Sequence, residues 1–321
     1  MTESITRLRD NIQSVFYGNN AAVDQVICCL LARGHVLIED VPGVGKTVLA
    51  TALARSLDCS FSRIQLTPDM LPGDVLGVTV FDRDTARFEL KRGPIFANIV
   101  LADEVNRTTP RTQSAMLEAM NENSVSIEGR TIDLEQPFMV VATQNPYEFE
   151  GTYPLPESQL DRFLMRIHVG YPSPEDEARV LERRPGAQGR HAAGEDEAIG
   201  ALRRLKPVMS REEVLGLQER VDGVRMERSL IDYIIALGAA TRSHEELEVG
   251  VSPRGTLALA QAARATAVLR ERDHCVPEDV SDNVVSVFTH RVVCRAYSDN
   301  GHVDTGRRIV ESVLESVDSP A

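Results

Sequence analysis

A short apolar run followed by a glycine-rich turn constrains the fold of this chain more than any other feature. Residues 35–39 (HVLIE) are mostly apolar and bounded by turn residues, which is typical of a buried strand. The turn that follows is VPGVGKT at residues 41–47, and a helix is predicted over residues 46–57. A strand, a glycine-rich turn and a helix in this order form the context that a phosphate-binding loop requires.

The parts of this turn match the chemistry of a nucleoside triphosphate and its magnesium ion. Glycines let consecutive backbone N–H groups face the phosphates, and the helix N-terminus adds its dipole. We expect Lys46 to reach the β- and γ-phosphate oxygens and Thr47 to ligate Mg²⁺. The alternative is a turn of the same composition without a ligand. The residues predicted to bind ATP are Pro42, Gly43, Val44, Gly45, Lys46, Thr47 and Val48.

Asp40 departs from the usual pattern of such a loop. It occupies the position where the first glycine of the loop normally lies. An acidic side chain repels phosphate charge at short range, so it is tolerated there only if it points away. We therefore expect the Asp40 side chain to face away from the phosphates.

A second apolar strand ends in two carboxylates. Residues 98–104 (NIVLADE) place Asp103 and Glu104 at the end of a run that is expected to lie beside the phosphate loop. There Asp103 would hold Mg²⁺ through water, and Glu104 would polarise the attacking water. Two carboxylates after an apolar strand are, by themselves, typical of a solvated strand end. Because a phosphate loop is also present, we favour a role for them in ATP hydrolysis.

A third strand, predicted over residues 139–143, ends in Gln144-Asn145-Pro146. An amide at the tip of a central strand can orient water or contact the γ-phosphate, which makes Asn145 a candidate catalytic residue. A turn-forming asparagine before proline is the alternative.

Two arginines are candidates for contact with the γ-phosphate. Arg162 comes just before a predicted strand, and Arg254 lies in the first turn of a helix that starts at Ser252-Pro253. A cation in the first turn opposes the helix dipole, so helix stability does not explain Arg254. Functional arginines in such positions stabilise γ-phosphate charge, one across a subunit boundary and one from a helical domain. For each, a surface ion pair is the alternative.

The remaining apolar runs predict the fold class. They alternate with helical stretches, which indicates an α/β core with a mostly parallel sheet flanked by helices. Two hairpins are expected to interrupt this pattern, over residues 79–90 and 124–134. The runs lie at residues 61–66, 98–102, 138–143 and 163–169.

Residues 185–197 are rich in glycine, alanine and polar side chains, a composition typical of a linker. We therefore expect two domains. Residues 1–186 would form the α/β nucleotide-binding core with its N-terminal helices and hairpins, and residues 187–321 an all-helical lid. In the second part, Ser210 and Glu213 predict a capping box, and no strand-like alternation is visible.

Composition limits the remaining function classes. The net charge of −13 would repel a phosphate backbone, which disfavours nucleic acid as a partner. The five cysteines have no Cys-x-x-Cys spacing, which favours reduced thiols in an intracellular protein. No run approaches the ~20 apolar residues needed to span a bilayer, and the polar first ten residues do not resemble a signal segment. The cytoplasm is the expected location.

Taken in order, these motifs resemble the MoxR branch of the AAA+ ATPases. The likeness covers nearly the whole chain and includes RIQLTPD at residues 63–69 and GPIF at residues 93–96, outside the nucleotide motifs. The other segments that carry it are GVGKT at 43–47, LADEVNR at 101–107, TQNP at 143–146, LPE at 155–157, LDRF at 160–163 and SPR at 252–254.

The resemblance implies a ring of six identical subunits. In such a ring Asn145 would be sensor one, Arg162 the finger that reaches the neighbour's ATP, and Arg254 sensor two. The two hairpins would face the pore or the upper surface of the ring. The resemblance also implies a chaperone-like ATPase that remodels a protein client, in some cases together with a protein that carries a von Willebrand A domain.

Two other functions stay open on the same scaffold. A nucleic-acid motor or loader is disfavoured by the charge and by the absence of an appended basic domain. A scaffold that binds ATP without hydrolysing it would need a defective water-activating residue, whereas Glu104 is present.

Overall fold

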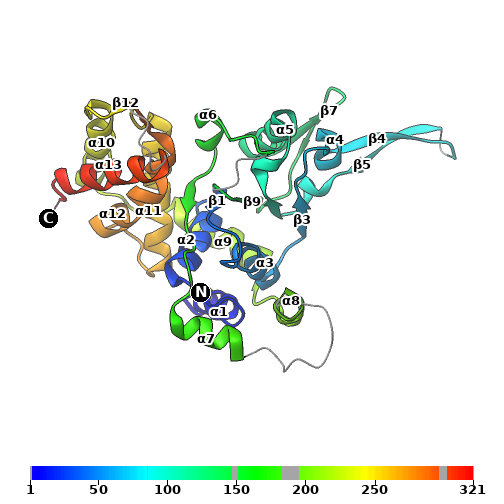
Figure 1. Ribbon diagram of the computed structural model, residues 1–321, viewed down its shortest axis with the longest axis horizontal. Coiled ribbons are helices and arrows are strands. Elements are labelled where there is room, and N and C mark those ends of the chain that lie inside the picture. The colour runs from blue at the N-terminus through cyan, green and yellow to red at the C-terminus, as the bar shows by residue number, and fades with distance from the viewer. Residues whose placement is uncertain (1, 85, 147–150, 183–194, 296–301, 321) are drawn as a thin grey trace. The chain divides into compact units, whose positions relative to one another are not determined.

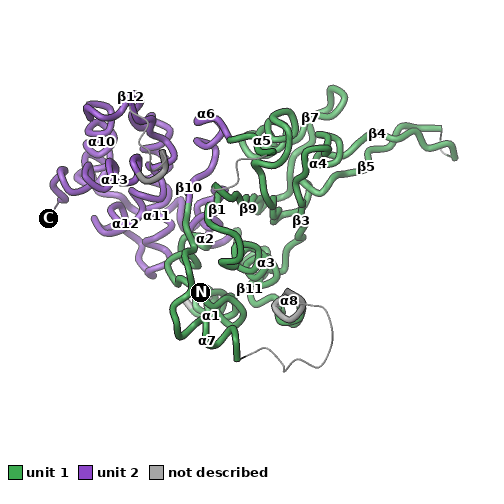
Figure 2. Tube along the Cα trace, in the orientation of Figure 1, with its two compact units in different colours: residues 1–27, 37–154, 167–215 green, residues 28–36, 155–166, 216–321 purple. Residues whose placement is uncertain are grey.

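The computed structural model describes residues 2–84, 86–146, 151–182, 195–295 and 302–320 (Figure 1). The chain forms two compact units, and each combines segments that are distant in sequence (Figure 2). The first comprises residues 1–27, 37–154 and 167–215. The second comprises residues 28–36, 155–166 and 216–321.

A five-stranded sheet carries the strand ends on which the sequence motifs lie. β1 and β6 are buried at every residue, and such strands appear in the sequence as continuous apolar runs because both faces of the sheet are covered. The pairs β3–β6 and β6–β9 are parallel, which confirms the predicted α/β fold. In sheet order the strands are β10 (Met165–Ile167), β1 (Val36–Glu39), β9 (Met139–Gln144), β6 (Ile99–Asp103) and β3 (Phe61–Gln65).

Capping side chains set where several helices begin. Thr109 accepts a hydrogen bond from the Thr112 N–H (3.4 Å), and Ser210 and Glu213 form a reciprocal capping box (2.8 and 3.2 Å). The capping box predicted at Ser210 and Glu213 is thereby confirmed. The helices up to residue 222 are α1 (Thr2–Gln13), α2 (Asn20–Leu31), α3 (Lys46–Ser56), α4 (Pro72–Leu76), α5 (Pro110–Glu122), α6 (Glu157–Leu160), α7 (Pro174–Glu182), α8 (Glu195–Arg204) and α9 (Arg211–Asp222). Short 3₁₀ turns are η1 (Pro94–Phe96) and η2 (Val105–Arg107).

Both predicted hairpins are present in the first unit. β4 (Gly77–Asp82) pairs antiparallel with β5 (Arg87–Arg92), and the hairpin extends away from the sheet (Figure 1). β7 (Ser124–Ile127) pairs with β8 (Arg130–Asp133) in the register that places Val125 opposite Ile132. A further parallel pair joins β2 (Leu57–Asp58) to β11 (Met209–Ser210).

The second unit is mainly helical. Besides α6 and parts of α2 and α9, it contains α10 (Arg228–Ser243), α11 (Pro253–Leu269), α12 (Pro277–Phe288) and α13 (His302–Ser316), with the 3₁₀ turn η3 (Thr289–Arg291). It also contains an antiparallel pair, β12 (Leu247–Val249) with β13 (Val293–Cys294), which the prediction of an entirely helical segment missed. Strands of two and three residues are too short to show an alternating pattern.

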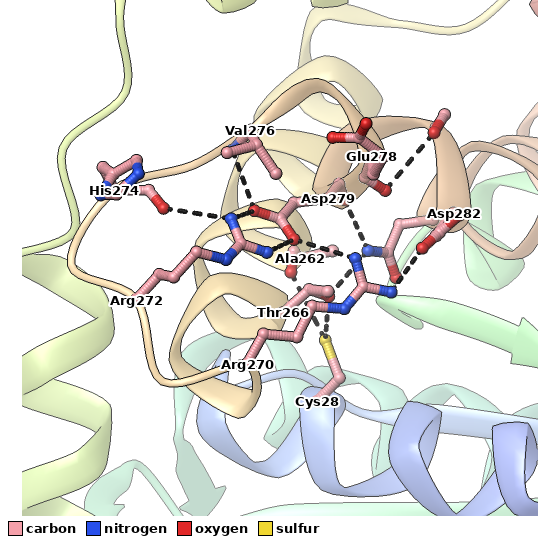
Figure 3. Close-up of polar contacts among 12 residues, drawn as sticks. Cys28, Ala262, Thr266, Arg270, Arg272, His274, Val276, Glu278, Asp279 and Asp282 are labelled. Atoms are coloured by element: carbon pink, nitrogen blue, oxygen red, sulfur yellow. Dashed lines mark hydrogen bonds and ion pairs between the residues drawn. The ribbon is translucent and has the colours of Figure 1, made fainter.

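A cluster of ion pairs fixes the turn between α11 and α12 (Figure 3). The fully buried Asp279 accepts hydrogen bonds from Arg272 (2.7 Å to each oxygen) and from Arg270 (3.2 Å). The same carboxylate accepts the N–H of Val276 (3.0 Å), so it also caps the start of α12. Since every donor is charged or a backbone amide, the burial of this carboxylate is well compensated.

The predicted linker at residues 185–197 lies mostly outside the described residues. Its last three residues belong to the first turn of α8, so the linker ends earlier than predicted. The division into domains at residues 186 and 187 stays a prediction. Within the described ranges, no helix combines the length and the apolar character needed to cross a membrane.

Candidate nucleotide-binding site

The loop between β1 and α3 has the backbone conformation of an anion site. Gly43 and Gly45 have φ of +88° and +91°, a region in which side chains other than glycine are strained. Gly45 is the N-cap of α3 and provides no side-chain acceptor for the first N–H groups of the helix. The first turn therefore offers backbone donors and the positive end of the helix dipole to a ligand.

Lys46 extends from the first residue of α3 to the ends of two neighbouring strands. Its ammonium donates to the backbone carbonyl of Asp40 (2.5 Å), just after β1, and to that of Gln144 (2.9 Å), at the end of β9. The side chain is about half-buried, and burial lowers its pKa, while the nearby carboxylates of Asp40, Asp103 and Glu104 oppose that shift. The ammonium thus lies at the carboxyl edge of the sheet.

The Asp40 carboxylate is engaged by backbone donors. Oδ1 accepts the N–H of Val41 (2.8 Å), and Oδ2 accepts the N–H of Gly170 (2.7 Å). An aspartate can therefore occupy the usual glycine position because two amides bind its charged oxygens. The same contacts fix the loop to the chain segment that follows β10.

Thr47 and Asp103 meet at the same edge. The Thr47 hydroxyl lies 3.3 and 3.4 Å from the two oxygens of Asp103, whose side chain is 6% exposed. Asp103 Oδ1 also accepts the Thr143 hydroxyl (2.7 Å), and Oδ2 accepts Arg63 Nη2 (2.8 Å) and Nε (3.0 Å). A hydroxyl and a carboxylate are hard oxygen ligands of the kind that Mg²⁺ binds, so these residues fit the metal.

Glu104 follows Asp103 in a left-handed conformation with φ of +58°, a strained position for a residue other than glycine. Its N–H donates to the Thr143 hydroxyl (3.0 Å). Its carboxylate accepts the Gln65 amide (2.9 Å), and Arg107 Nε lies 3.1 Å from the same oxygen. The carboxylate is therefore held between the last residue of β3 and the last residue of η2.

Asn145 lies directly after β9, at the edge that holds Lys46, Thr47, Asp103 and Glu104. Its backbone carbonyl accepts the side-chain amide of Asn106 (3.3 Å), which connects it to the turn after β6. The structure thus brings these five predicted residues together within the first unit.

The two candidate arginines belong to the second unit. Arg162 lies between α6 and β10, and so before a strand as the sequence predicts, although α6 was not predicted. Arg254 is the second residue of α11, in the first turn of a helix as predicted. The Arg254 side chain is 54% exposed, and its Nε lies 3.8 Å from a carboxylate oxygen of Asp161.

Arg63 and Thr143 were not predicted as site residues. The sequence feature that could have identified them is a polar or charged side chain on a strand that lies next to the acidic strand β6. Arg63 lies on β3, which pairs with β6 in a register that places Gln65 opposite Asp103. That pairing joins residues about forty positions apart in the chain, and residue spacing alone does not predict it.

Comparisons with known proteins agree with this geometry. The family model described as "ATPase family associated with various cellular activities (AAA)" matches residues 35–165, and "AAA lid domain" matches residues 239–313. The chain is 44% identical to "Uncharacterized protein YeaC" of Bacillus subtilis, covering 97% of this chain and 93% of the relative. It is 39% identical to "Chaperone MoxR1" of Mycobacterium tuberculosis, covering 96% and 80%. A crystal structure of a Cytophaga hutchinsonii protein superposes with a TM-score of 0.84 at 34% identity, covering 100% of this chain and 96% of that one.

A phosphate loop after β1, an acidic strand end on the same parallel sheet and a helical lid define an AAA+ fold. Given its similarity to the MoxR proteins over nearly its whole length, the chain belongs to the MoxR family of AAA+ ATPases. The resemblance seen in the sequence is thereby confirmed.

Proposed function

We propose that this chain binds ATP with Mg²⁺ and hydrolyses it to ADP and phosphate. The observation that carries the proposal is the approach of the Thr47 hydroxyl to both Asp103 oxygens, at 3.3 and 3.4 Å, beside the Lys46 ammonium. Mg²⁺ is usually held in proteins by one or two such oxygens together with waters and substrate phosphates. The site therefore has the ligands for a metal-bound triphosphate and needs few others.

In this proposal residues 42–48 form the phosphate-binding loop, in which the backbone N–H groups of residues 43–48 and the Lys46 ammonium bind the phosphates. Thr47 and Asp103 hold Mg²⁺, whose charge stabilises the developing negative charge on the phosphate oxygens. Glu104 accepts a hydrogen bond from the attacking water and polarises it, and Asn145 orients that water or contacts the γ-phosphate.

The proposal includes assembly into a homo-oligomeric ring, which family membership suggests to be hexameric. Arg162 would act as the finger that contacts ATP bound to the neighbouring subunit, and Arg254 as sensor two. We also propose a domain division at residues 186 and 187. The match of the lid model to residues 239–313 supports a helical second domain.

We propose that the cycle remodels or matures a protein client in the cytoplasm, with a von Willebrand A domain protein as the candidate partner. The name of the mycobacterial relative, a chaperone, supports this class of activity. The net charge of −13 disfavours nucleic acid as the client.

Phosphate release and ATP binding, measured on the same preparations, test the proposal. Glu104→Gln should bind ATP and release almost no phosphate, whereas Lys46→Ala should lose binding. Glu122→Gln is the matched control, because Glu122 is an exposed carboxylate at the end of α5 in the same unit. Equal turnover in wild type, Glu104→Gln and Lys46→Ala would refute the mechanism.

Mixed assemblies test the finger. Arg162→Ala should abolish turnover with little change in nucleotide affinity. A mixture of Arg162→Ala and Lys46→Ala subunits should recover part of the turnover, because the second supplies a finger to the first. Recovery would be absent if Arg162 served the ATP of its own subunit.

A further inference from the structure

A buried arginine of the second unit binds the segment that carries Arg162. Arg291, the last residue of η3, has a side chain only 3% exposed. Its guanidinium donates to the backbone carbonyls of Asp161 (3.2 Å), Phe163 (2.6 Å) and Leu164 (3.1 Å). It also donates to the carbonyl of Val287 and, through Nε, to the Asp161 carboxylate (2.7 Å). One side chain therefore binds three of the four peptide carbonyls from residue 161 to residue 164.

These contacts determine the path of the segment. Carbonyl groups buried without a partner are costly, and a guanidinium is a planar fork of five donors that can satisfy several of them. Burial lowers the pKa of Arg291, and the charge of Asp161 opposes that shift. The buried charge is thus compensated by the same segment that the guanidinium holds.

The Asp161 carboxylate links both candidate arginines to this contact. One oxygen accepts Arg291, and the other lies 3.8 Å from Arg254 Nε. Arg162 is the next residue in the chain, so a shift of the Asp161 peptide moves Arg162 as well.

The packing of the chain agrees with these contacts. Residues 155–166 group with residues 28–36 and 216–321, although the chain before and after them belongs to the other unit (Figure 2). The Leu164 N–H donates to the His35 carbonyl (2.8 Å), a further contact within the second unit. The Arg162 segment is therefore part of the helical unit in space, though not in sequence.

We propose that Arg291 is a positioning residue that fixes residues 161–164 to the helical unit, so that one rigid body carries both Arg162 and Arg254. The inference rests on the proposed function, which assigns those two arginines to nucleotide sites. Any movement of the helical unit during the cycle would then move the finger and sensor two together.

A buried ion pair with a purely structural role would stabilise the helical unit without fixing the position of residues 161–164. Asp279 provides the matched control for that case. Asp279 is also a buried charge held by arginines in the second unit, and its contacts with Arg270, Arg272 and Val276 do not involve residues 161–164 (Figure 3). Asp279→Asn should weaken the helical unit and leave the Arg162 segment in place.

Amide hydrogen exchange decides the structural claim without any need for activity. In Arg291→Met, the amides of Phe163 and Leu164 should exchange at least about tenfold faster than in wild type, while those of α10 and α11 stay protected. Asp279→Asn should not show this local change. Arg291→Lys keeps the charge but not the fork, so it should give an intermediate result and serves if the methionine variant does not fold. Wild-type protection of residues 161–164 in a folded Arg291 variant would overturn the inference.

Mixed assemblies test the consequence for the finger. Arg291→Lys is placed either in the Lys46→Ala subunit, which donates the finger, or in the Arg162→Ala subunit, which receives it. The recovered turnover should fall more when the donor carries the change, and equal loss in both placements would contradict a positioning role. If the parent mixture recovers no turnover, the proposed trans-acting finger fails, while hydrogen exchange still decides the role of Arg291.

Discussion

Replacing Arg63 by glutamine should make the site bind Mg²⁺ more tightly when a nucleotide is present. Arg63 places two nitrogens 2.8 and 3.0 Å from one oxygen of Asp103, and the Thr143 hydroxyl binds the other oxygen at 2.7 Å. Both oxygens of the proposed metal ligand are thus engaged by donors of the protein. Mg²⁺ must compete with a guanidinium that carries charge of the same sign.

The magnitude follows from the exposure of the two partners. Hydrogen bonds that involve charged groups contribute about 1.5–3 kcal/mol, and exposed ion pairs about 0–1 kcal/mol. Asp103 is 6% exposed but Arg63 is 52% exposed, so we take a value near the lower end of the first range, about 1.5 kcal/mol. Since 1.4 kcal/mol corresponds to a factor of ten, the Mg²⁺ concentration for half-saturation should fall about tenfold.

Calorimetric titration of ADP at a series of Mg²⁺ concentrations measures this coupling. Affinity for ADP in chelator should change little in Arg63→Gln, because the change acts on the metal ligand. Arg111→Gln is the matched control, since Arg111 is an exposed arginine of α5 in the same unit. An unchanged or higher half-saturating Mg²⁺ concentration in Arg63→Gln, with a normal control, would refute the reasoning.

Three further predictions concern stability. Burial, together with the charges of Arg291 and Arg166, lowers the pKa of His290 in the folded protein. As the pH falls below about 6.5, His290 is therefore protonated in the unfolded chain before it is protonated in the folded one. The free energy of unfolding should then fall by up to about 1.4 kcal/mol per pH unit. His290→Asn should flatten this dependence in urea unfolding measured from pH 7 down to about pH 5, and an identical slope would contradict the assignment. Asp279→Ala should lower the free energy of unfolding of the helical unit by about 1.5–3 kcal/mol, because two partly exposed arginines and the N–H of Val276 lose their charged acceptor. A loss below about 0.5 kcal/mol in denaturant titration would show that water replaces the carboxylate. Asp40→Ala should cost about 1.5–3 kcal/mol through its two lost amide contacts, and unchanged thermal unfolding would show that those contacts contribute nothing.

Local patterns predicted much of the fold. β1 and α3 flank a turn whose glycines, at φ of +88° and +91°, need that residue type, so the motif itself specifies the geometry. The β7–β8 hairpin was predicted because apolar residues alternate on both strands around a turn, and the structure pairs Val125 with Ile132. In both cases the information lies within about fifteen residues.

Long-range contacts account for what the sequence did not show. Arg63 and Asp103 are forty residues apart and meet only because β3 pairs with β6. Asp161 and Arg291 are separated by 130 residues. The β12–β13 pair was missed for a different reason, since strands of two and three residues show no period.

The central claim is that Lys46, Thr47 and Asp103 hold one metal-bound triphosphate. Calorimetric titration of Mg-ATP into Glu104→Gln tests it most directly, because that variant should bind without turnover. The account predicts saturable binding of one nucleotide per subunit site in Glu104→Gln and no binding heat in Lys46→Ala. Folded Glu104→Gln protein that shows no heat on addition of Mg-ATP would contradict the account.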